Sequence, residues 1–240
     1  MSPDVSTLDL PVSVLLALWA PLPSSRGAQV VQGADGSHLV ADDVAPWGLG
    51  CLDLGSWLHD LGPLLRVGAV LVSPADPVPG LREALDVGEA VVLETAQGRR
   101  VLLVPRRRGT SVTWHVTEQD TAVAPADPTY ARREVHEATE EAIDVLVSLD
   151  LARERPELAE ELSDLVSAVA DPRLVPPTLE PRRKALLERS LRLEAICTTA
   201  LANDGAAVSA TQAQRRLEAL RPLLVVARRG VGAATQWWAH

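Results

Sequence analysis

The chain has 240 residues, 47% hydrophobic and 23% charged, a balance that excludes a disordered protein and allows one large domain or two ordinary ones. Its formal net charge of −9 argues against a protein that generally coats nucleic acid or an anionic membrane surface. Lys184 is the only lysine and phenylalanine is absent, a skew typical of GC-rich genomes such as those of actinobacteria.

Two features bear on the cellular compartment. Cys51 and Cys197 are far apart and in no metal or redox spacing, which fits a reducing cytoplasm better than a disulfide framework. The apolar run at residues 12–20 is too short to span a bilayer, and the stretch before it carries Asp4 and Asp9 but no basic residue. We interpret it as a buried helix and expect a cytoplasmic protein without membrane attachment.

Residues 1–125 alternate short apolar segments with Gly, Pro and Asp. Gly98 lies between two of these segments and predicts a hairpin, which a further strand after "RRRGT" extends into an antiparallel meander. The pattern predicts an α+β domain with an antiparallel sheet rather than a wound parallel sheet. Its strands are expected at residues 37–42, 68–73, 90–95, 100–105 and 111–116, and its helices at residues 11–20 and 54–65.

Residues 126–240 carry helical periodicity. Asp127 can cap a first helix, a second is expected at about residues 156–170, and a third starts near Pro181 and ends at "NDG". Ser209 and Gln212 form a capping box for a fourth, which Pro222 should kink or split.

These breaks predict an up-down four-helix bundle as the second domain. Its buried positions should include Val135, Leu146, Leu162, Ile196 and Leu220. The apolar stripe of the first helix runs through Ala131, Val135, Ala138 and Ala142, at spacings of four and three.

Charge divides the bundle into two halves. Residues 126–180 hold fourteen acidic and five basic side chains, whereas residues 181–240 hold four acidic and ten basic ones. We expect the acidic helix pair to pack beside the basic pair. The arginine-rich faces of the basic helices are then neutralised by the acidic helices and not by nucleic acid. A nucleic-acid accessory protein that uses these arginine-rich faces is the alternative function.

His136 invites a metal hypothesis because His136-Glu137 and Glu140 resemble the H-E-x-x-H pattern of zinc proteases. His136 and Glu140 share a helical face, but a zinc protease needs a second histidine and a third ligand. The neighbouring carboxylates fit the solvated start of an acidic helix. We therefore predict no metal site and no cofactor.

The stretch "PRRRGTSVTWHV" offers a candidate anion-binding loop. Arg106, Arg107 and Arg108 are expected in this loop, with His115 facing outward on the following strand and Trp114 facing the core. A solvated turn is the competing interpretation.

No catalytic set is predicted. Ser56, His59 and Asp60 lie within five residues, but the members of a catalytic triad normally come from separate elements. Gly48 and Gly50 lack the third glycine of a dinucleotide fingerprint.

The terminal "TQWWAH" places Trp237 and Trp238 side by side. Exposed, they would form an association surface; buried, they would cap the bundle or dock on the first domain. The leading hypothesis is a non-enzymatic module that acts through a protein partner or self-association. The alternative is an enzyme or an anion binder with a site between the domains.

Overall fold

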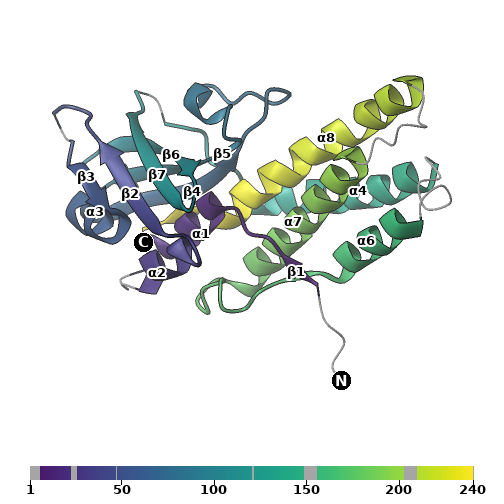
Figure 1. Ribbon diagram of the computed structural model, residues 1–240, viewed down its shortest axis with the longest axis horizontal. Helices are drawn as coiled ribbons and strands as arrows, with labels where there is room; N and C mark the ends of the chain where they lie inside the picture. Colours follow the sequence, from purple (N-terminus) through teal and green to yellow (C-terminus); the bar gives the residue numbers. More distant parts are fainter. Residues whose placement is uncertain are drawn as a thin grey trace. The chain divides into compact units, whose positions relative to one another are not determined.

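The computed structural model describes residues 6–22, 26–46, 48–120, 122–148, 156–202 and 210–239. Within these ranges the protein is an α+β structure with seven α-helices and a mixed seven-stranded sheet (Figure 1). The chain forms two compact units. An α+β unit comprises Leu10–Ala126, Arg173–Leu179 and Thr235–His240, and a helical unit comprises the remainder, so the chain passes between the units several times.

The sheet of the α+β unit has the strand order β3-β2-β7-β6-β5-β4-β9. Strands β5, β6 and β7 form the antiparallel meander that the sequence predicts, whereas β2 pairs with β7 in parallel. The sheet is therefore mixed rather than purely antiparallel. The strands are β2 (Ser37–Asp42), β3 (Gly50–Asp53), β4 (Leu64–Leu71), β5 (Glu89–Thr95), β6 (Arg100–Arg108), β7 (Ser111–Glu118) and β9 (Trp237–Trp238).

Three helices belong to this unit. Helix α1 (Val12–Trp19) is buried all round, as its unbroken apolar sequence predicts, and lies against β4 and β5. Helix α2 (Arg26–Gln32) packs on α1, where a Cβ on Gly27 would come within 3.2 Å of the Trp19 carbonyl oxygen. Helix α3 (Leu54–Leu61) is capped by Asp53, whose side chain accepts the Ser56 backbone N–H, and ends at Gly62 with a φ of 85°. The short 3₁₀-helix η1 (Arg82–Ala84) contributes to an apolar cluster with β5 and β6.

The helical unit contains α4 (Pro128–Ser148), α6 (Pro156–Ser167), α7 (Pro181–Ala202) and α8 (Ala210–Thr235). Asp127 accepts the backbone N–H groups of Thr129 and Tyr130 at the start of α4, as a helix cap does. Pro222 does not divide α8 into two helices. The capping box expected at Ser209 and Gln212 rests on side chains outside the described part of the chain. Strands β1 (Thr7–Leu8) and β8 (Val169–Ala170) pair in parallel, so the predicted second helix ends earlier than expected.

One apolar cluster draws residues from all four of these helices. The stripe of α4 is buried as predicted, and Val135 and Leu220 are fully buried. Leu146 and Leu162 are only partly buried at the edge of the cluster. Ile196 is half-buried because the next residue, Cys197, takes the inward position on α7.

Candidate binding sites

His38 lies at the centre of a buried hydrogen-bonded chain in the α+β unit. The Trp114 indole N–H donates to His38 Nδ1 at 3.3 Å, and His38 Nε2 lies 3.0 Å from Asp35 Oδ2. Hydrogen bonds from His38 and then Arg107 lower the pKa of Asp35. Both ring nitrogens are thus used within the protein, and His38, 4% exposed, also belongs to the lining of the hollow described below.

The three arginines predicted to form a loop lie in strand β6 instead, and the turn is at Gly109 and Thr110. Because side chains alternate along a strand, Arg107 faces the side of Val112 and donates to Asp35 Oδ1 at 2.8 Å. Arg106 and Arg108 face the other side.

His115 lies on the same side of the sheet as Arg106 and Arg108, and all three side chains are exposed. Trp114 is buried and His115 exposed, as the alternation of β7 predicts. The structure therefore places three of the four predicted anion-binding residues on one side of the sheet and Arg107 on the other. Anion binding itself stays a prediction.

An ion network that sequence reasoning missed lies at the end of β2. Arg99 forms two hydrogen bonds with the fully buried Asp42 carboxylate, at 2.7 and 2.9 Å, and a third with Glu118 at 2.8 Å. The Trp57 indole N–H donates to the same Asp42 carboxylate at 2.8 Å. Burial alone would raise the pKa of Asp42, but the hydrogen bonds from Arg99 and Trp57 outweigh it and the pKa is lowered.

A signal for both networks is present in the sequence. His38, Val40 and Asp42 alternate along "SHLVAD" and face the same buried side. Polar side chains at inward positions require buried partners, so the strand predicts two such networks without naming the partners.

An open hollow of about 1160 Å³ lies beside α1, α2 and α3. Its walls include Leu16 and Trp19 of α1, Val31 of α2, Leu58 of α3 and Trp237 of β9. Ser56, His59 and Asp60 also line it, all from α3 and all exposed. They therefore come from one helix, not from the separate elements of a triad.

The two terminal tryptophans form the edge strand β9, which pairs antiparallel with β4. Trp237 lies opposite Val67 and lines the hollow, whereas Trp238 lies opposite Arg66, whose guanidinium is 5.0 Å from the Trp238 ring centroid. Trp238 is 41% exposed. The preceding Gln236 is buried and holds the strand in place by accepting from Arg66 and donating to the Val67 carbonyl.

His136 and Glu140 share a face of α4, as predicted, and both are exposed, with 3.8 Å between His136 Nε2 and Glu140 Oε1. Among the described residues no three His, Cys, Asp or Glu side chains converge in a metal-binding geometry. In the same part of the chain no helix is long and apolar enough to cross a membrane.

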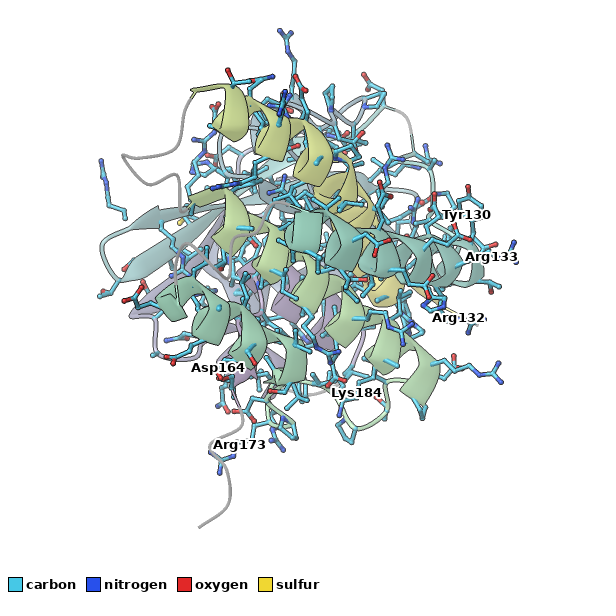
Figure 2. The ribbon with its side chains drawn as sticks, turned by 90° about the vertical axis from the view of Figure 1, so that its right-hand side faces the viewer. Tyr130, Arg132, Arg133, Asp164, Arg173 and Lys184 are labelled. Atoms are coloured by element: carbon cyan, nitrogen blue, oxygen red, sulfur yellow. The ribbon has the colours of Figure 1, made fainter. Side chains whose placement is uncertain are left out.

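The helical unit exposes apolar side chains on its acidic helices. Ile143 and Val147, one turn apart on α4, are 57% and 74% exposed, and Val166 of α6 is also exposed. Figure 2 shows Tyr130, Arg132 and Arg133 projecting together from the start of α4, with Asp164 on α6 well away from them. The residues at the start of α4 therefore precede Ile143 and Val147 by about three helical turns.

Comparison with known proteins places a family model on this unit. Residues 129–232 match the model described as "Rv1486c-like protein, C-terminal domain". The match covers less than half of the chain and lies within α4 to α8. Neither the curated proteins nor the solved structures include a significant match to the chain.

Proposed function

We propose that this chain is a non-enzymatic protein-interaction module whose helix α4 docks a basic amphipathic helix of a protein partner. The observation that carries the proposal is the exposed pair Ile143 and Val147. Residues four apart on a helix form a continuous ridge, which is the usual anchor of helix-to-helix docking. Burying two aliphatic side chains of this size contributes roughly 1.5–3 kcal/mol each.

Charge favours a basic partner over an acidic one. The exposed carboxylates of Glu140 and Asp144 lie next to this ridge on α4, each three residues from one of its members. A helix with lysine or arginine along one side of an apolar stripe would place opposite charges next to these groups. Such complementarity speeds association and disfavours acidic partners.

We also propose that α4, α6, α7 and α8 form an up-down four-helix bundle that holds this ridge rigid. Its support is the apolar cluster to which all four helices contribute. A cytoplasmic location fits the two free thiols, of which Cys51 is exposed and Cys197 buried.

The test compares the wild-type chain with the double variant Ile143→Asp/Val147→Asp. Proteins that co-purify from the native host are quantified for both, and each candidate is then reduced to a synthetic peptide of its basic amphipathic segment. We expect fluorescence anisotropy to show peptide binding that weakens at least tenfold in the double variant and falls with added salt. Val166→Asp, an exposed valine on α6, is the matched control and should bind normally.

Two results would overturn the proposal. Equal peptide affinity for the wild type and the double variant would show that α4 is not the docking surface. A wild-type dimer that the double variant converts to a monomer in sedimentation equilibrium would show that the ridge is covered by a second copy instead.

The exposed group formed by Arg106, Arg108 and His115 supports a second candidate function, which is anion binding. Titration with inorganic phosphate should shift the NMR signals of His115 in the wild type and not in Arg106→Gln/Arg108→Gln. Unchanged His115 signals at millimolar phosphate would remove this candidate.

A further inference from the structure

We infer that the hollow of the α+β unit binds an organic cation with an apolar body, such as a primary amine on a hydrocarbon or aromatic frame. The inference does not depend on the docking surface of α4, since none of the lining residues belongs to the helical unit.

The charge of the hollow points to a cation. The described residues that line it include two carboxylates, Asp53 and Asp60, two histidines, His38 and His59, and neither lysine nor arginine. Hydrogen bonds from Ser56 lower the pKa of Asp53, so this carboxylate is ionised at neutral pH. An anionic ligand would meet repulsion from both carboxylates, whereas a cation would gain attraction from both.

The tryptophan side chains that line the hollow also favour a cation. Trp19 and Trp237 both line the hollow, and a tryptophan ring is the best aromatic surface for a cation. Trp19 is 5% exposed and the Arg26 guanidinium already lies 5.8 Å from its ring centroid, so Trp237 supplies the ring for a ligand. Trp237 is half-buried, which leaves part of its ring accessible to a ligand.

The remaining walls require an apolar ligand body. They are formed by aliphatic side chains from α1, α2, α3 and β4, namely Leu16, Leu22, Val31, Leu54, Leu58 and Leu64. The volume of about 1160 Å³ is at the upper end of the usual range for small-molecule sites, about 300–1,000 Å³. A small inorganic cation would leave these walls in water, so the site favours a larger amphipathic cation.

The experiment uses three ligands of matched shape, titrated into the full chain by isothermal calorimetry. 4-Phenylbutylammonium should bind with a Kd at least tenfold lower than the neutral 4-phenylbutanol, and 4-phenylbutanoate should bind more weakly than the alcohol. Equal affinities for the ammonium and the alcohol, or tighter binding of the carboxylate, would overturn the inference.

Variants locate the effect in the hollow. Asp53→Asn removes the charge but retains a good helix cap, and Asp60→Asn removes the second charge on α3. Each should reduce the preference for the ammonium over the alcohol several-fold. Glu83→Gln on η1, an exposed carboxylate outside the hollow, should not change it. Loss of the preference in all three variants alike would show nonspecific attraction and overturn the site.

A competing peptide identifies the source of the cation. An end-blocked peptide with one lysine between leucines should displace the ammonium at lower concentration if the natural ligand is a protein side chain, and at higher concentration if it is a free amine. Both results support a cation site. A wild-type chain that binds neither the ammonium nor the peptide would overturn it.

Discussion

Replacing Gly230 with alanine tests how closely α8 approaches α4 and α7. A Cβ at this position would lie 2.3 Å from Ser190 Oγ on α7 and 2.6 Å from Val135 Cγ2 on α4. Real Cβ atoms essentially never approach so closely. Both neighbouring residues are fully buried, so neither can move into solvent to make room.

The magnitude follows from two opposed effects. At an exposed helix position, replacing glycine with alanine stabilises by about 0.8–1 kcal/mol through helix propensity. Overpacking a closed core costs typically about 1–3 kcal/mol. Because the added Cβ clashes on two sides, the overpacking cost should lie near the upper end of this range. The net loss of unfolding free energy is then about 1–2 kcal/mol. For a chain of this size that corresponds to a fall in Tm of about 2–8 °C.

The assay can separate the two units. All six tryptophans belong to segments of the α+β unit, so tryptophan fluorescence follows that unit while circular dichroism at 222 nm is dominated by the longer helices of the other. Urea unfolding of Gly230→Ala should shift the dichroism midpoint. Gly55→Ala on α3 is the control. A Cβ there would lie 3.3 Å from Asp53 Oδ1, and because the Asp53 side chain is exposed it can shift by a few tenths of an ångström, so this substitution should be close to neutral.

A double-mutant cycle with Ser190→Ala measures how much of the Gly230→Ala penalty comes from the contact with Ser190. The Ser190 hydroxyl is buried without a hydrogen-bond partner among the described residues, so its removal alone should cost little. In the Ser190→Ala background the penalty of Gly230→Ala should fall by about 0.5–1 kcal/mol. A stabilised Gly230→Ala protein, or an unchanged penalty in the second background, would refute the close helix approach.

Three further outcomes are expected. Asp42→Asn removes one of the two carboxylates that pair with the buried Arg99, which keeps Glu118, and should destabilise the protein in urea unfolding at pH 7 by about 3 kcal/mol, the lower end of the cost of breaking a buried ion pair. The pKa of Asp42 is lowered in the folded state from its ordinary value of 3.8. The stability that the ionised Asp42 contributes is therefore present above pH 3.8 and is lost as the pH falls below this value, so the loss of stability in acid should be smaller in Asp42→Asn. Burial raises the pKa of the Cys197 thiol to about 12, so iodoacetamide at pH 8 should label Cys51 alone in the native chain and both thiols in urea, as mass spectrometry would show. Gln236→Ala removes one hydrogen bond of the Arg66 guanidinium, which still donates to the Val123 carbonyl, and one hydrogen bond to the Val67 carbonyl. It should cost about 1–3 kcal/mol, with faster amide exchange in β4; unchanged exchange would contradict the role of Gln236 in holding β9.

Local patterns predicted most of the elements. The expected strand at residues 37–42 coincides with β2, and the meander of β5, β6 and β7 follows from β-branched runs separated by glycine turns. Helix α2 was not predicted, because its seven residues carry only two inward positions and too few apolar side chains for a periodic signal. The arginines of β6 were placed in a loop because exposed charged side chains at a strand end resemble a turn.

For the candidate site residues too, local patterns predicted the side-chain orientations but not the partners. The alternation of residues along β7 correctly predicted that Trp114 faces inward and His115 outward, because the side-chain period of a strand is a local property. The partners of His38 and Asp42 could not be predicted, since Trp114, Trp57 and Arg99 are between 15 and 76 residues away in the chain. The hollow likewise combines three helices with a strand from the C-terminus, and no local pattern marks such a meeting.

The sequence by itself determined most of the longer elements, the alternation of their buried faces and the α+β class, because propensity, capping and periodicity act over a few residues. Only the tertiary structure decided that β2 pairs in parallel with β7, that β9 joins the sheet beside β4, and that Gly230 marks a close helix contact. These features join residues that are distant in the chain. Their free energy comes from burial and hydrogen bonds that exist only after the whole fold has brought both partners together.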